Sequence, residues 1–224
     1  MEWLVVIITS VTILFLVCRW NQGLVRKRRE RLIDTYIFPE SISVKINEMY
    51  PHLTDKDLSL VISTLRDYFH VCNIAGVKMV SMPSQVVDVA WHEFILFTKE
   101  YNYFCKKALG KFLHHTPAEA MKKPTLSQLG VKRAFGIKRA WRISCYRAGI
   151  NHKSATNLPM LFAIDSILKI EDGFKYSLDC SRSNGGDYCA THIGCGSDCA
   201  GGGSDFSGSE GGADGGCGGG CGGD

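Results

Sequence analysis

An uncharged apolar run near the start of the chain constrains its fold more than any other feature. Residues 3–18 carry no charge and are mainly Val, Ile, Leu and Phe, with Trp3 and Trp20 at the edges. No polar face interrupts the run, as it would in an amphipathic helix of a soluble protein. Its 16 residues fall short of the ~20 that span a bilayer, but snorkelling of Arg19 extends it. We therefore expect a transmembrane anchor within residues 1–35.

The charges around this run predict the orientation of the chain. Glu2 precedes the run, five basic residues lie within residues 26–31 after it, and no signal-peptide cleavage site is visible. Because positive flanks stay in the cytoplasm, we expect a single-pass protein of the cell membrane with its C-terminal part inside. The membrane is thus the expected partner, and its anionic inner leaflet should contact the basic residues Arg26, Lys27, Arg28, Arg29 and Arg31.

The expected oxidation state of the cysteines follows from this orientation. The chain has ten, six of them at or after Cys180. Thiols stay reduced in the cytoplasm, so we expect thiols or metal ligands rather than disulfides. Gly makes up 17 of the last 40 residues, which predicts a disordered, low-complexity tail over 180–224. Incidental cysteines and a soft-metal site are both open interpretations of this tail.

Residues 36–179 are expected to form a mainly α, compact, bundle-like domain. Thr54 and Asp57 suggest a capped helix start, with Gly76 ending that helix. The next helix should begin at Pro83-Ser84 and continue toward Leu109. Further helices are expected over 131–147 and 158–170, and a short strand over 174–178.

Metal-competent side chains gather in one stretch of this domain. Asp88 and His92 are four residues apart and share a helix face. Cys105 lies 13 residues beyond His92, about 20 Å along an unbroken helix. A zinc or iron site would therefore need His114 or His115 to fold back, or a helix break near Lys99-Glu100. The alternative is structural: Asp88 hydrogen-bonds His92, Cys105 fills the core, and the two later histidines form a pair at a helix end or in a loop.

No established catalytic motif is present in the sequence. His92-Glu93 is followed by Leu96 where a zinc protease has its second His. The leading hypothesis is a non-enzymatic membrane-anchored binding or interaction protein with a protein partner, which a metal could assist. A metal- or thiol-dependent enzyme built on Asp88, His92, Cys105 and His115 is the alternative.

A basic stretch follows the histidines, with no acidic residue from Ala120 to Ile164. Aromatic residues are interleaved in it, a pattern found in helices that bind nucleic acid. An anchored protein could equally lay this helix on anionic lipid, or its aromatics could point into the core. We favour lipid over nucleic acid because the anchor holds the helix near the membrane, and expect contacts from Lys132, Arg133, Lys138, Arg139 and Arg142.

The pattern Asp88-x-x-Trp91-His92, Leu96, Tyr101, Cys105, Gly110 and His114-His115 resembles the glycine-rich domain-containing protein-like family. The later Leu158-Pro159-x-Leu161-Phe162-Ala163-x-Asp165, Asp172-Gly173-x-x-Tyr176 and Asp179-Cys180 resemble its bacterial, membrane-anchored members. Phe94 and Phe104 depart from the pattern where the resemblance would place a second His and an acidic residue. The resemblance therefore implies an architecture rather than an activity.

Overall fold

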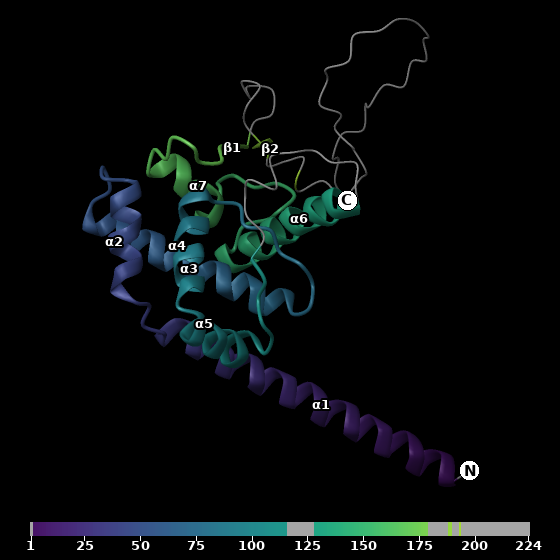
Figure 1. Cartoon of the computed structure of the whole chain (residues 1–224). Coiled ribbons are helices and arrows are strands. Elements are labelled where there is room, and N and C mark those ends of the chain that lie inside the picture. Colours follow the sequence, from purple (N-terminus) through teal and green to yellow (C-terminus); the bar gives the residue numbers. More distant parts are fainter. Residues whose placement is uncertain (1, 116–127, 179–187, 190–192, 194–224) are drawn as a thin grey trace, which may run out of the picture.

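The computed structural model describes residues 2–115, 128–178, 188–189 and 193. Its described part is mainly helical, with one long helix leading into a compact domain (Figure 1), which confirms the predicted fold class. The elements in chain order are α1 (Glu2–Thr35), α2 (Glu40–Met49), α3 (Asp55–Ala75), α4 (Gln85–Leu96), α5 (Thr98–Phe104), the π-helical turn η1 (Cys105–Leu109), α6 (Gln128–Ala148), α7 (Met160–Ile167), β1 (Tyr176–Ser177) and β2 (Tyr188–Cys189).

Helix α1 joins the predicted anchor and its basic flank into one element of 34 residues. Its apolar first half is exposed and projects from the domain as a single rod (Figure 1). By length and composition, α1 can cross a membrane, and no other helix in the described residues can. Only its last turns enter the domain, where Ile33 is fully buried.

The core of the domain is built around α3, which packs against α1, α2, α4, η1, α6 and α7. Aromatic rings from four segments meet there. Phe69 of α3 lies 4.8 Å from Phe104, and Phe38 lies 5.1 Å from Phe94, measured between ring centroids. Edge-to-face and tilted pairs of this kind stabilise a core beyond the area they bury.

Local sequence signals set several helix ends as predicted. Thr54 and Asp57 form the expected capping box at the start of α3. Gly76 follows α3 with a φ of 61°, a left-handed conformation that costs glycine little. The Ser84 hydroxyl accepts from the Val87 N–H at the start of α4. Pro159 precedes α7, where its missing N–H is not needed.

The predicted single helix from Pro83 to Leu109 is wrong, because the chain breaks at Phe97. There the Phe97 N–H bonds to Phe94 O at 3.1 Å instead of continuing the α-helical pattern. Trp91 and Tyr101 would be ~15 Å apart along a straight helix. The break folds α5 back on α4, so that the Trp91 indole N–H donates to the Tyr101 hydroxyl at 3.1 Å.

Asp165 of α7 ties the two halves of the domain together. Its carboxylate accepts from the Ser84 hydroxyl and the Gln85 N–H, each at 2.7 Å, and from Val86 N–H at 3.3 Å. It also accepts from Phe174 N–H at 2.8 Å. Burial raises the pKa of Asp165, and the four hydrogen bonds oppose that rise. An α7 side chain therefore caps the otherwise unpaired N–H groups of α4.

Most of the predicted disordered tail, 180–224, lies outside the described residues. Within it, β2 pairs in parallel with β1, Tyr188 opposite Tyr176. The Tyr188 ring also lies 6.0 Å from Phe174. At Tyr188 and Cys189 the chain therefore still contacts the domain.

Candidate functional site

Helix α4 faces the segment 111–115 and brings three of the predicted site residues together. His115 Nε2 lies 2.9 Å from Asp88 Oδ1, and both side chains are largely buried. The His115 ring lies 4.6 Å from Trp91 and 5.6 Å from His92, between ring centroids. His115 is therefore the later histidine that folds back onto α4, where it contacts Asp88.

His114 and Cys105 do not join this group. The His114 ring packs on Phe112 at 4.9 Å. The Cys105 thiol is fully buried, and burial raises its pKa while bonds to the Leu113 backbone and Tyr101 oppose the rise. A protonated, enclosed thiol is a poor nucleophile and a poor ligand. Among the residues that the structure describes, no three His, Cys, Asp or Glu side chains are arranged to hold a metal ion.

A chain of buried hydrogen bonds holds the 111–115 segment against α4 and α5. The Trp91 N–H donates to the Tyr101 hydroxyl, which in turn donates to Leu113 O at 2.5 Å. Burial raises the pKa of Tyr101, so the hydroxyl keeps its proton and can donate. This chain fixes the position of His115 and the wall of the neighbouring cavity.

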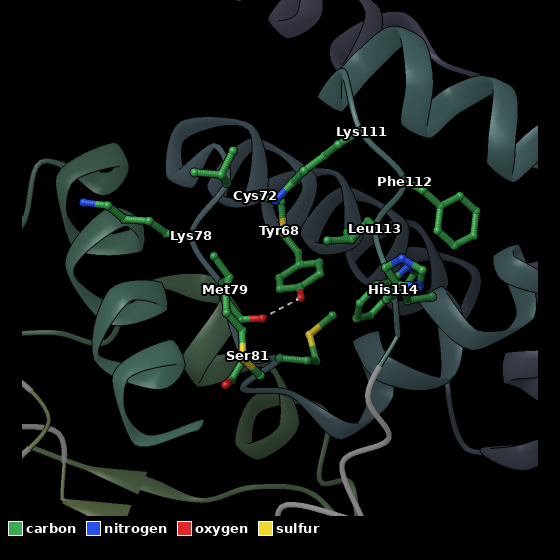
Figure 2. A pocket seen from close by; sticks show the side chains of 13 residues that line it. Tyr68, Cys72, Lys78, Met79, Ser81, Lys111, Phe112, Leu113 and His114 are labelled. Atoms are coloured by element: carbon green, nitrogen blue, oxygen red, sulfur yellow. Dashed lines mark hydrogen bonds between the residues drawn. The ribbon is translucent and has the colours of Figure 1, made fainter. Parts of the chain in front are cut away.

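That cavity has a volume of about 290 Å³ and lies between α3, the 77–82 segment and the 111–114 segment (Figure 2). Trp91 of α4 forms part of its wall, so it adjoins the Asp88–His115 pair. Sequence reasoning missed it, because most of its lining comes from α3 and the 77–82 segment, where the sequence shows no recognisable motif.

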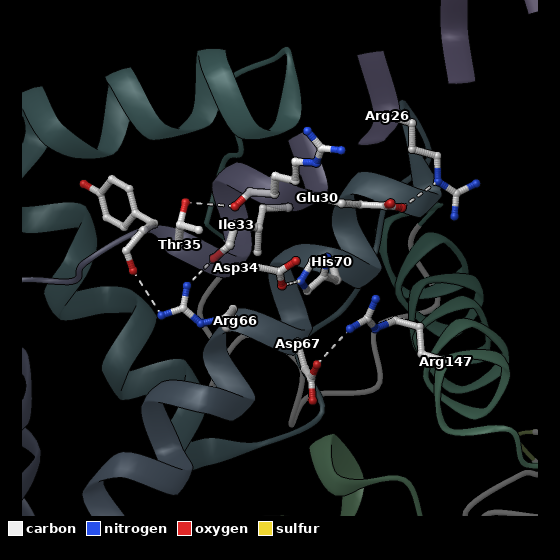
Figure 3. Close-up of polar contacts among 11 residues, drawn as sticks. Arg26, Glu30, Ile33, Asp34, Thr35, Arg66, Asp67, His70 and Arg147 are labelled. Atoms are coloured by element: carbon white, nitrogen blue, oxygen red, sulfur yellow. Dashed lines mark hydrogen bonds and ion pairs between the residues drawn. The ribbon is translucent and has the colours of Figure 1, made fainter. Parts of the chain in front are cut away.

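The end of α1 is fixed to α3 by polar contacts (Figure 3), which we call the α1 junction: Ile33, Asp34 and Tyr36 with Arg66 and His70. The Arg66 guanidinium donates to Ile33 O, and to Tyr36 O at 3.0 Å. His70 Nε2 lies 2.7 Å from Asp34 Oδ1. A cation at these carbonyls satisfies the C-terminal acceptors of α1 and complements its dipole.

The basic residues predicted to touch the membrane fall into two groups. The first group is on α1, which packs beside η1, and the Arg29 side chain lies directly against Gly110. Arg26 forms an exposed ion pair with Glu30 at 3.0 Å. A second basic pair, Lys106 and Lys107, is exposed on η1 next to α1.

Helix α6 presents its predicted basic face only in part. Arg139 donates to Met79 O, whereas Arg142 is exposed. Trp141 lies in the core and donates its indole N–H to His152 O at 3.0 Å, while Tyr146 is 75% exposed. The side chains of Lys132 and Arg133 lie outside the described residues, and Lys138 is half-buried.

The cysteines agree with the prediction in part. Cys72, Cys105 and Cys145 are buried free thiols, and Cys18 is an exposed one on α1. Cys189, however, is disulfide-bonded. The prediction that all ten cysteines are thiols or metal ligands is therefore wrong for Cys189.

Comparison with known proteins places the chain in a family. A family model matches residues 28–196, which include the basic end of α1, the whole helical domain and the β1–β2 pair. The chain belongs to the UCP032817-like family. No curated protein and no solved structure matches the chain. The resemblance to the glycine-rich domain-containing protein-like family stays a prediction.

The region that matches the UCP032817-like family model includes both motif blocks seen in the sequence. In the first block, Trp91 and Tyr101 form the hydrogen-bonded chain that holds the 111–115 segment. In the second block, Asp165 caps α4, and a Cβ at Gly173 would lie 2.7 Å from the Asp165 Cβ. These motif residues therefore maintain the fold, and the family name assigns no activity to them.

Proposed function

We propose that this UCP032817-like protein is a single-pass membrane protein that holds a ligand-binding helical domain at the cytoplasmic surface. The observation that carries the proposal is α1, one unbroken helix of 34 residues with an exposed apolar half and a buried, capped end. Because the α1 junction fixes the helix to α3, the domain would keep one orientation to the bilayer.

The basic residues of α1 and η1 support this placement. Arg26, Lys27, Arg28 and the η1 pair Lys106 and Lys107 would lie where the helix leaves the bilayer. Each basic residue close to anionic lipid adds about 1 kcal/mol to membrane binding. The second basic group, on α6, would add lipid contact only through residues that stay exposed, such as Arg142.

Membrane attachment is tested with charges placed in the apolar half of α1. An Arg at the centre of a membrane helix costs roughly 2.5–3.5 kcal/mol. The double variant Val11→Arg and Leu14→Arg should release the full chain from membranes washed with alkaline carbonate. The matched control is Ile37→Arg and Val44→Arg, two exposed apolar residues outside the anchor, and it should stay with the pellet. Release of the wild-type chain by carbonate would refute the anchor.

Orientation is a separate question, and two observations bear on it. The basic flank of α1 favours a cytoplasmic domain, whereas the disulfide at Cys189 is typical of an oxidising compartment. Val77 is 92% exposed, so a Val77→Cys variant can report the location of the domain. An impermeant maleimide should label it only after the cells are permeabilised, whereas Glu2→Cys should be labelled in intact cells. Reversal of this pattern would place the domain outside.

A metal-dependent or thiol enzyme is the second candidate, favoured by the contact of His115 with Asp88 and His92. A site at this group could use zinc or iron, with Cys105 excluded by its burial. Elemental analysis of the full chain, with His115→Ala as the variant and His152→Ala as the control, tests it. Stoichiometric metal that only His115→Ala removes would support the site, and no metal in the wild type would end it.

Nucleic-acid binding through residues 122–153 is the weakest candidate. It would give an affinity that falls steeply with salt concentration, because bound phosphates release counterions. An affinity for single-stranded RNA or DNA that does not change between low and physiological salt would exclude it.

A further inference from the structure

The cavity beside Trp91 is mostly apolar and adaptable. Met79 and Met82 come from the 77–82 segment, and Leu113 comes from the opposite side. Methionine side chains are flexible and polarisable, so they fit ligands of irregular shape. Tyr68 and Cys72 of α3 close the cavity from behind (Figure 2).

One end of the cavity carries a positive charge. Lys111 directs its ammonium group toward Cys72, whereas Lys78, also at the cavity, directs its ammonium away (Figure 2). Burial raises the pKa of the Cys72 thiol to about 12, so the thiol is neutral and does not balance Lys111. None of the described residues that line the cavity is acidic. An anionic group would therefore find a partner at Lys111 and meet no acidic side chain in the described lining.

We propose that this cavity binds a single-chain carboxylate amphiphile, a medium-chain fatty acid, with its carboxylate at Lys111 and its hydrocarbon chain between Met79, Met82 and Leu113. At ~30 Å³ for each water-sized group, the volume of about 290 Å³ accommodates about ten such groups. A ten-carbon fatty acid such as decanoate fits that size.

The position of Lys111 gives such a ligand a short route from the bilayer. Lys111 follows Gly110, which lies against Arg29 of α1, and η1 packs beside α1. The charged end of the cavity is therefore next to the point where the anchor enters the domain. This route rests on the proposed membrane attachment, whereas the binding site itself does not.

The test uses the full chain in nanodiscs of zwitterionic lipid and a decanoate analogue with a photoreactive diazirine near its methyl end. Irradiation should attach the probe to peptides that contain residues 77–82 or 111–114, and titration of the adduct yield gives an affinity. Decanoate should compete for the site, and uncharged decanol should compete at least tenfold more weakly. Tenfold corresponds to ~1.4 kcal/mol.

Three substitutions separate the contribution of charge from that of fold. Lys111→Met should weaken binding at least tenfold, and Lys111→Arg, which keeps the charge, should restore most of the affinity. Lys78→Met is the matched control, because this lysine borders the same cavity but points away from it, and it should change the affinity less than twofold. Circular dichroism would verify that each variant is folded.

Two results would overturn the proposal. One is a set of adducts confined to α1 and the lipid, and the other is equal labelling of the wild type and Lys111→Met. If the chain proves not to be membrane-bound, the same titration is carried out in buffer without nanodiscs. Failure of the anchor and failure of the ligand site are therefore recognised separately.

Discussion

Asp165 offers the sharpest test of how the fold is held together. Its Oδ2 accepts from Gln85 N–H and Phe174 N–H, and its Oδ1 accepts from Ser84 Oγ–H and Val86 N–H. In Asp165→Asn, one oxygen becomes an NH₂ group, so at least one backbone N–H loses its acceptor in either orientation of the amide. A buried donor without a partner costs ~1–3 kcal/mol, and we expect a loss of stability of about that size.

Asp165→Ala removes the acceptor for all four donors and should cost more. We expect roughly 4 kcal/mol or more, below the sum of four separate penalties because contacts within one group are not additive. The matched control is Asp172→Asn. Asp172 is exposed and accepts from the Tyr50 hydroxyl at 3.1 Å, and the Asn oxygen can still accept there, so its effect should stay below ~0.5 kcal/mol.

The assay is urea denaturation of the full chain in detergent micelles, followed by tryptophan fluorescence. The order of stabilities should be wild type and Asp172→Asn first, Asp165→Asn next, and Asp165→Ala last. An Asp165→Ala variant as stable as the wild type would refute the assignment of Asp165 as the cap of α4.

Three further predictions concern pH, backbone and thiols. Burial, the largest cause, lowers the pKa of His70 in the folded state below its usual 6.5. As the pH falls, His70 is therefore protonated in the unfolded state before it is protonated in the folded state. Stability should therefore fall as the pH drops through 6.5, by at most ~1.4 kcal/mol per pH unit, and a His70→Asn variant should show a flatter pH profile in the same urea assay. Gly110 has a φ of 72°, so Gly110→Ala should lower the thermal midpoint, at a cost of ~1 kcal/mol or more. Gly23→Ala, which meets no atom within 4 Å, should leave the midpoint unchanged or higher. Burial raises the pKa of Cys72 to about 12 and of Cys145 to about 11. Neither thiol should react with a maleimide at pH 8 until urea unfolds the domain, and prompt labelling of either at full native fluorescence would contradict their burial.

Local signals in the sequence predicted the helix ends well because each depends on neighbouring residues. The Thr54–Asp57 capping box and Gly76 act within a single helix turn, so their effect could be inferred without the fold. The break at Phe97 could not, because it follows from packing of α5 back onto α4. Sequence pattern there favoured a continuous helix, and tertiary contacts decided otherwise.

The candidate site was predictable only in its composition. Sequence marked Asp88 and His92 as neighbours on one helix face, and required a later histidine to return to them. It could not choose between His114 and His115, nor show that Cys105 would be enclosed. Asp165 acts on Ser84 across 81 positions of sequence. The Arg66 side chain of α3 similarly forms a hydrogen bond at the end of α1. No local sequence pattern predicts either contact.

We propose that α1 crosses the membrane and continues without a break into the domain. Spin labels placed one at a time on the cysteine-substituted full chain in nanodiscs, at positions from Val5 to Val25, test it directly through their accessibility to oxygen and to a water-soluble nickel complex. The depth of the labels in the bilayer should be greatest near Val11 and fall smoothly toward Val25. The mobility of the labels should vary along this stretch with the period of an α-helix. Labels that the nickel complex reaches equally at every position would contradict the account.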